Sequence, residues 1–402
     1  MSQSQALGPE VGRYQRIALI AGAAGLILCA VGAFLDTTAF FQAYLMAFLY
    51  WLAFPLGALG IVALYHLGGG TWGFGIRRPL EAAMTTIPLF AILFVPIIFG
   101  LNTLYPWTHE TDPLLQAKSA YLNVPFWLAR AAIYFIVWSG AALLLYRTSL
   151  EQDRTGDPDL LRLLGRRSRL GLGFYVLAIS FASIDWAMSL DPRWFSTIYG
   201  MLFLAGQGLT GVAFAIIVLR WLAARPPTAE VTTPQTFNDL GNLLLAFVMI
   251  WTYMNLSQYL IIWAANLPEE VTWYLRRTEG GWQWYTLLLF GLQFLLPFVV
   301  LLARDNKRNG QRLARLAGFI LFMRLADMFW IVMPELRHDG LAISWLDIAA
   351  PIGIGGIWVA TFLWRLQQQP LLALHDPRDP RLRPAEHDHG AAEAQPAGEA
   401  RA

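Results

Sequence analysis

Charged residues and cysteine are scarce in this chain. Only 14% of its 402 residues are charged, whereas about a quarter of a soluble globular chain is charged. The net charge is only +2 and the basic residues are expected in short loops, so nothing in the composition supports nucleic-acid binding. Hydrophobic residues make up 56% of the chain, a fraction typical of a protein that lies within a membrane.

The chain has one cysteine, Cys29, and six histidines. A single cysteine excludes an intramolecular disulfide, an iron–sulfur cluster held by cysteines and the attachment of c-type haem. Only His66 lies next to an apolar run, so a haem held by two helix histidines is not expected. We therefore expect no metal site and no cofactor bound through His or Cys ligands.

Apolar runs of about 20 residues recur along the sequence, and this is the length that crosses roughly 30 Å of hydrocarbon. We predict an all-α integral membrane protein with about ten transmembrane helices, arranged as two four-helix bundles plus peripheral helices. We interpret the prolines in several spans as ordinary kinks, without a matched pair of broken helices in the two halves. The predicted spans are 14–35, 40–65, 79–100, 123–146, 170–190, 198–222, 239–265, 282–303, 313–333 and 345–366.

Lys and Arg residues are distributed unevenly over the two ends of these spans. Most of the 29 lie on the side of the N-terminus. Those on the other side are Lys118, Arg193, Arg276, Arg277 and Arg337. The positive-inside rule therefore makes the N-terminal side cytoplasmic, and an even number of spans places both termini there.

Three regions follow from this pattern. Residues 1–13 form a cytoplasmic N-terminus, and residues 14–366 form the transmembrane domain. Residues 367–402 are rich in Pro, Ala, Asp and His and lack apolar periodicity, which predicts a disordered cytoplasmic tail.

Four ionisable residues fall inside the predicted spans: Arg130, Asp185, Arg324 and Asp327. All four are expected in the outer half of the membrane, where two cations and two anions can neutralise one another. Arg324 and Asp327 are three residues apart and therefore face the same way on one helix. Two interpretations stay open: salt bridges that hold helices together, or a protonatable site or relay.

Asp185 ends an apolar run that breaks at Pro192 and resumes near Tyr199. Ser183 and Tyr199 are close to it in sequence, and their hydroxyl groups could pass protons on. We therefore add both residues to the candidate proton relay.

His66 and Glu81 stand at the predicted cytoplasmic ends of the second and third spans, joined by a glycine-rich connection. They are candidates for the inner mouth of a proton path, and ordinary polar caps at the membrane interface are the alternative. The aromatic residues around Trp273 and Trp282 are expected to be interface anchors rather than a quinone pocket.

Three segments of the chain resemble a known family. They are SIDWAMSLDPRWFSTIYG (183–200), NLPEEVTWYLRRTEGGW (266–282) and PFVVLLARDNKR (297–308). Together they are similar to the second large membrane subunit of bacterial alternative complex III, in the NrfD/polysulfide-reductase membrane-anchor family. The resemblance covers roughly residues 14–366.

The resemblance implies a subunit of a quinol:cytochrome c (or other high-potential acceptor) oxidoreductase in the bacterial inner membrane. Its implied partners are a paralogous quinol-binding membrane subunit, an iron–sulfur subunit and multihaem cytochrome subunits, and quinone or quinol is the implied cofactor. In that family this type of subunit is associated with proton movement. Asp185 would then occupy the acidic position of the signature, with Arg130, Arg324 and Asp327 as polar neighbours.

Two other functions fit the composition. A secondary transporter with a central charged site is one alternative, and a purely structural membrane anchor of the complex is the other. No residue in the chain is assigned a catalytic role.

Overall fold

The computed structural model describes residues 8–110 and 112–382, and in these ranges the chain folds into helices and no strands. Ten helices are long and apolar enough to cross a membrane. The prediction of an all-α multi-pass membrane protein with about ten spans is therefore confirmed.

Eight spans are single continuous helices. They are α1 (Pro9–Leu35), α2 (Thr37–Gly68), α8 (Val124–Thr155), α9 (Pro158–Trp186), α10 (Tyr199–Leu222), α12 (Pro234–Ala265), α17 (Gly310–Leu336) and α18 (Leu346–Leu366). Pro55 lies inside α2 without ending it, because packing within the bundle compensates for the missing backbone donor.

The third and eighth spans are interrupted. The third consists of α3 (Phe74–Met84), α4 (Ile87–Leu93) and α5 (Val95–Phe99). The eighth consists of α14 (Trp282–Phe290), a π-helical turn, η4 (Gly291–Leu295), and α15 (Leu296–Leu302). Each of these interruptions is a single turn inside one span, with proline at the turns of the third span and a π-turn in the eighth, so the interpretation as ordinary kinks stays a prediction.

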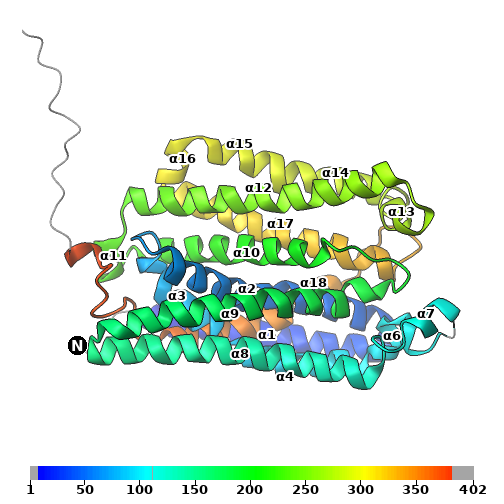
Figure 1. Cartoon of the computed structure of the whole chain (residues 1–402), viewed down its shortest axis with the longest axis horizontal. Helices are drawn as coiled ribbons and strands as arrows, with labels where there is room; N and C mark the ends of the chain where they lie inside the picture. The colour runs from blue at the N-terminus through cyan, green and yellow to red at the C-terminus, as the bar shows by residue number, and fades with distance from the viewer. Residues whose placement is uncertain (1–7, 111, 383–402) are drawn as a thin grey trace, which may run out of the picture.

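The helices form two groups that meet along α2 and α10 (Figure 1). In one group α2 packs on α3 and α9, and α8 packs on α9. In the other group α10 packs on α12 and α17, and α14 packs on α17. The pair α1 and α18 lies against α2 as the peripheral layer.

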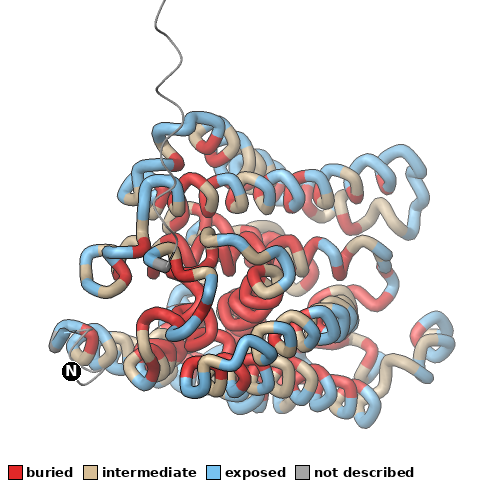
Figure 2. Tube along the Cα trace, turned by 60° about the vertical axis from the view of Figure 1, so that its left-hand side comes forward, coloured by how far each residue is buried: buried red, intermediate tan, exposed pale blue. Residues whose placement is uncertain are grey.

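The two central helices are the most deeply buried. In the most apolar 18-residue windows of α2 and α10, 89% and 83% of the residues are buried. Figure 2 shows buried residues concentrated through the middle of the molecule and exposed residues along its outer helices. Glycine residues allow the backbones of α2 and α10 to approach closely where the helices cross. A Cβ at Gly57 would collide with the Gln207 carbonyl oxygen, and a Cβ at Gly211 would lie 2.7 Å from the Gly57 backbone.

Short elements close the two ends of the bundle. The end that carries the N-terminus, which we call the N-terminal face, holds α11 (Thr228–Val231), α16 (Arg304–Arg308) and η5 (Pro380–Leu382) (Figure 1). The opposite face holds α6 (Leu101–Leu104), η2 (Pro106–Thr108), α7 (Pro113–Ala117), η3 (Met188–Leu190) and α13 (Pro268–Leu275). By the distribution of Lys and Arg these are the predicted cytoplasmic and periplasmic faces.

Candidate functional site

Arg130 and Asp185 form an ion pair near the opposite face. Asn123 caps the start of α8 by accepting the Phe126 N–H at 3.0 Å, and this places Arg130 two turns into the helix. Asp185 lies in the last turn of α9. Arg130 Nε and Nη2 donate to the two carboxylate oxygens of Asp185 at 2.8 and 2.9 Å, so the pair is bidentate.

The Asp185 carboxylate has donors on both of its oxygens. Besides Arg130, the Tyr134 hydroxyl donates to Oδ2 at 2.6 Å. The remaining guanidinium nitrogen of Arg130 donates to the Tyr121 carbonyl oxygen at 2.9 Å, and the Tyr121 ring covers the guanidinium at 3.8 Å. Trp127 Nε1 donates to the Asp185 carbonyl oxygen at 2.9 Å. This saturated arrangement joins α8 to α9 as a clamp.

Arg324 and Asp327 form a second buried pair, one turn apart on α17. The Arg324 guanidinium fills the space over Gly206 of α10, where a Cβ would collide with it. In contrast to Asp185, this pair is incompletely bonded: Arg324 Nε and Asp327 Oδ1 are buried and have no hydrogen-bond partner among the described residues, although the Trp251 indole of α12 lies beside the carboxylate. A buried polar atom without a partner is unfavourable, and a proton or a water molecule at Asp327 would relieve it.

The structure brings together some of the predicted site residues and not others. Within residues 8–110 and 112–382, no hydrogen bond or ion pair joins Asp185 to Arg324, Asp327 or Tyr199. The Ser183 hydroxyl donates to the Ser180 carbonyl oxygen at 2.8 Å, within its own helix. The four charges predicted as one set therefore form two separate pairs.

A third charged group, at the opposite face, was not identified from the sequence. Arg276 pairs with Asp191 at 2.8 Å and also with Glu335, and Arg277 Nη1 donates to Glu335 at 2.7 Å. The Arg277 guanidinium stacks on the Trp273 ring at 3.3 Å. Burial lowers the pKa of Arg277, and Glu335 offsets only part of this effect. The local signal for this charged group is the Arg276-Arg277 doublet, which lies between Trp273 and Trp282 in the sequence.

This third group joins two of the three family-like segments. Trp194, in segment 183–200, donates from Nε1 to the Glu270 carbonyl oxygen at 3.0 Å and stacks on Trp273 with ring centroids 5.1 Å apart. The Asp191–Arg276 ion pair bridges the same two segments. Segments 183–200 and 266–282, which are far apart in sequence, therefore form one surface.

A cavity of about 390 Å³ lies beside Arg277, between α12, α13, α14 and α17. Its polar lining includes Asn255, Tyr274, Arg277, Gln283 and Thr286. Arg277 Nε is buried without a partner among the described residues. The cavity is therefore lined by aromatic rings and by several polar side chains.

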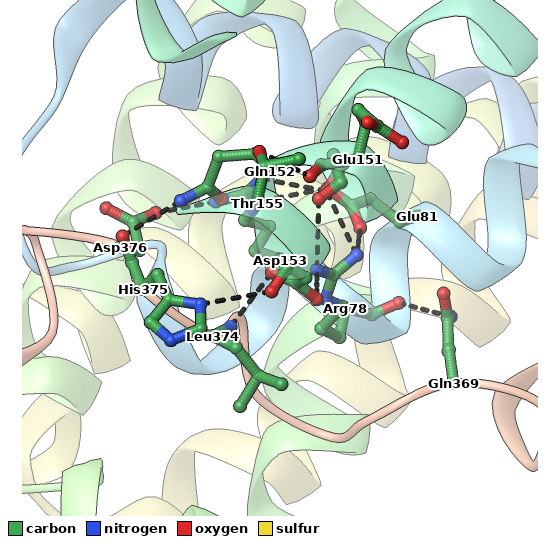
Figure 3. Close-up of polar contacts among 12 residues, drawn as sticks. Arg78, Glu81, Glu151, Gln152, Asp153, Thr155, Gln369, Leu374, His375 and Asp376 are labelled. Atoms are coloured by element: carbon green, nitrogen blue, oxygen red, sulfur yellow. Dashed lines mark hydrogen bonds and ion pairs between the residues drawn. The ribbon is translucent and has the colours of Figure 1, made fainter. Parts of the chain in front are cut away.

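Glu81 lies at the centre of a buried charged cluster at the N-terminal face (Figure 3). Arg77 Nε and Arg78 Nη1 donate to its two carboxylate oxygens at 2.9 and 2.5 Å. The Ser149 hydroxyl donates to Glu81 Oε1 at 2.6 Å. Arg77 and Arg78 precede the predicted span 79–100, which would leave them in a loop, but both are buried within α3. Their spacing of four and three residues from Glu81 was the local signal that could have placed them.

The segment after α18 packs onto this cluster. Asp376 pairs with Arg77 at 2.5 Å, and Gln369 donates to the Arg78 carbonyl oxygen at 3.1 Å. The Leu374 N–H donates to Asp153, which also pairs with Arg78 (Figure 3). The prediction of disorder from residue 367 is therefore wrong for residues 367–382, because buried ion pairs offset the entropy of ordering the segment. Residues 383–402 lie outside the described residues.

His66 is near the cluster but is not bonded to Glu81. Its Nε2 is buried and has no hydrogen-bond partner among the described residues. The ring of the preceding Tyr65 lies beneath the Arg378 guanidinium at 4.3 Å. The two residues predicted as an inner mouth thus lie at the same end of the bundle, with Glu81 fully bonded to its arginines and Ser149.

No protein-family model and no curated protein matches this chain. Among the described residues, no group of three or more His, Cys, Asp or Glu side chains could hold a metal ion. The function is therefore inferred from the sequence motifs and from the buried charges.

Proposed function

We propose that this chain is a membrane subunit, without a redox centre of its own, of a respiratory quinol:cytochrome c (or other high-potential acceptor) oxidoreductase of the alternative complex III type. It supports quinol oxidation on a paralogous membrane subunit. It relays protons through its buried charged residues. The proposed setting is the bacterial inner membrane, with both termini in the cytoplasm.

The observation that carries the proton-relay proposal is the incompletely bonded carboxylate of Asp327 inside α17. A buried carboxylate oxygen without a donor is a site where a proton can be taken up and released. The neighbouring Arg324 Nε also lacks a partner among the described residues, so the pair can rearrange when the charge nearby changes. Quinol oxidation in an adjacent subunit would supply such a change.

The surface formed by segments 183–200 and 266–282 supports the proposed partnership. The ion-paired residues Asp191 and Glu335 hold its two segments together and are buried, whereas Arg193, Phe195 and Leu267 of these segments are exposed. Aromatic and Arg residues are enriched at protein interfaces. We propose that this surface contacts the iron–sulfur and cytochrome subunits.

A quinone headgroup fits the cavity beside Arg277 in size and chemistry. Tyr274 would stack on the ring, and the amide of Gln283 would donate to a carbonyl oxygen. Quinone supplies two-electron, two-proton chemistry when it is bound. The role of this chain would be to orient the ring and to donate a hydrogen bond.

One observation favours the alternative of a secondary transporter. The third and eighth of the ten spans are interrupted, and these are corresponding positions in two halves of five spans. Interrupted helices in matching positions line the substrate sites of many transporters. The Arg130–Asp185 pair lies near the opposite face, away from a central substrate site, whereas Arg324 lies at the middle of α17 and is compatible with one.

Purification of the tagged chain from native membranes distinguishes these functions. The proposal predicts copurification of haem- and iron–sulfur-containing proteins together with quinol-dependent reduction of cytochrome c. A chain that purifies alone and transports a solute in liposomes would overturn it. A purely structural anchor would copurify, but loss of the Asp327 charge would then leave turnover per assembled complex unchanged.

A further inference from the structure

One exposed face of α9 carries arginines at its N-terminal end and apolar side chains after them. Arg162, Arg166 and Arg169 are exposed at intervals of four and three residues, so they share a face of the helix. Leu170, Phe174 and Leu177 continue this face, with exposed fractions of 63%, 59% and 57%. The face therefore changes from basic to apolar within one turn.

The depth of this transition matches the boundary of a membrane. The apolar part of the span, residues 170–190, has about the length that crosses the hydrocarbon core. Arg169 and Arg166 therefore lie at the level of the lipid phosphates. Long cationic side chains at this depth interact with anionic headgroups.

Arg166 and Arg169 are available to a ligand. Arg162 pairs with Asp159 at 2.7 Å, and Arg154 on the neighbouring α8 pairs with Glu151 at 2.5 Å. In the described parts of the chain, neither Arg166 nor Arg169 has an ion pair or a side-chain hydrogen bond. Arg147 and Arg167 of the same hairpin also lack an ion-pair partner among the described residues, so this end of α8 and α9 carries an excess of positive charge.

A shallow, wide-open depression, which we call the groove, continues from Arg169 along the apolar face and is lined by residues of α9 alone. It has a volume of about 640 Å³ and is lined by Arg169, Leu170, Gly173, Phe174 and Leu177, together with partly buried neighbours. Gly173 lies at the bottom of the groove, and its missing side chain leaves space there, because a Cβ at this position would meet no atom within 4 Å. An acyl chain can lie in this groove while its headgroup phosphate reaches the arginines.

We propose that this face of α9 binds one anionic glycerophospholipid. Arg166 and Arg169 bind the headgroup phosphate, and the groove over Gly173 holds an acyl chain. Charge complementarity decides the class of lipid, since two unpaired cations favour an anionic headgroup over a zwitterionic one. This site is separate from the buried charged pairs and does not depend on the proposed oxidoreductase function.

Native mass spectrometry of the purified full-length chain tests the proposal. The probes are phosphatidylglycerol and phosphatidylcholine with identical acyl chains, and inorganic phosphate. We expect one retained phosphatidylglycerol and no retained phosphatidylcholine. The double variant Arg166→Gln/Arg169→Gln should weaken phosphatidylglycerol binding by about tenfold or more. The variant Gly173→Leu should weaken it with both charges intact, because the new side chain fills the groove.

Two matched variants serve as controls. Arg154→Gln removes an exposed, paired arginine, and Gly140→Leu adds a side chain to α8 at a glycine that also has open space around it. Both should retain phosphatidylglycerol as the wild type does. Equal retention of the two lipids, or unchanged binding in both test variants, would overturn the proposal. Displacement of the lipid by millimolar phosphate would indicate a site for a free anion and would also overturn it.

Discussion

At the scale of single residues, Asp185 and Asp327 differ in how many hydrogen bonds their buried carboxylates accept. Asp185 accepts from Arg130 on both oxygens and from Tyr134. Asp327 has one oxygen without a partner among the described residues. A saturated carboxylate is stabilised as an anion and holds helices together, whereas an unsaturated one can exchange a proton at lower cost. We therefore assign the clamp to Asp185 and proton handling to Asp327.

Asp185→Asn should strongly destabilise the fold. Removing one partner of a buried pair leaves the other charge uncompensated, which reduces the free energy of unfolding by about 3–5 kcal/mol. Thermal unfolding in detergent measures this loss. Asp159→Asn, at an exposed pair, should have little effect, and the double variant Arg130→Leu/Asp185→Leu should recover much of the stability. A melting temperature of Asp185→Asn equal to that of the wild type would refute the clamp.

The sequence identified Arg130, Asp185, Arg324 and Asp327 because a charge inside an apolar run is visible without a structure. It placed Arg324 and Asp327 on one face of one helix, but it did not show that Arg130 pairs with Asp185, since this depends on the rotation and depth of two different helices. Glu335 and Asp191 were missed for a related reason. Both lie at span ends, where acidic residues are common, and only the fold brings Arg276 between them.

At the scale of elements, the segment 367–382 shows where composition fails as a guide. Pro- and Asp-rich sequence favours disorder, yet this segment supplies the ion-pair partner of buried Arg77. Arg77 and Arg78 would be costly to bury without carboxylates, and Asp376 is one of the three that balance them. Such pairing between distant segments is not encoded in any local pattern.

Docking of this segment should depend on pH. Burial alone would raise the pKa of Asp376, but Arg378 and Arg77 outweigh it and hold this pKa below its ordinary value. Docking is therefore stabilised above the ordinary pKa of the carboxyl group and weakens as the pH falls through the lower pKa of the docked form. Hydrogen-exchange protection factors of residues 371–381 should be high near neutrality and should fall below about pH 4.

Asp376→Asn should lower this protection already at neutral pH. Glu151→Gln, at an exposed residue that pairs with Arg154, serves as the control and should leave the protection unchanged. If the Asp376 variant kept full protection at pH 7, the ion pair with Arg77 would not be what holds the segment.

The crossing of α2 and α10 depends on Gly57. A Cβ at this position collides with backbone and cannot be accommodated by a rotamer change. We expect Gly57→Ala to reduce the free energy of unfolding by about 1–3 kcal/mol. Gly140→Ala should be neutral or slightly stabilising, because nothing lies within 4 Å of its Cβ. Equal stability of the two variants, measured by thermal unfolding, would show that the helices can separate without loss.

At the scale of the whole molecule, the spans were the most predictable feature. Long apolar runs indicate membrane spans directly, and all ten were found, but α8 ends at Thr155 rather than 146 and α9 begins at Pro158 rather than 170, because both helices continue past their apolar parts. The interruptions in the third and eighth spans were not predicted, since proline occurs equally in continuous α2. Whether a helix breaks at a proline depends on the neighbours that satisfy its backbone.

The orientation of the whole molecule is directly testable. Reporter fusions at residue 366 and at residue 266 should give opposite results. A fluorescent protein should fold at residue 366, on the predicted cytoplasmic side, and alkaline phosphatase should be active at residue 266. The reverse pattern would invert the molecule and place the buried pairs in the inner half of the membrane.

The most direct test of the account compares Asp327→Asn with Asp185→Asn in the assembled, purified complex. The measurement is proton release per electron during quinol-dependent reduction of cytochrome c. We predict that Asp327→Asn lowers proton-coupled turnover by about tenfold or more while assembly is retained. Asp185→Asn should lower stability and leave proton release per electron unchanged. Wild-type turnover and proton release in assembled Asp327→Asn would contradict the account.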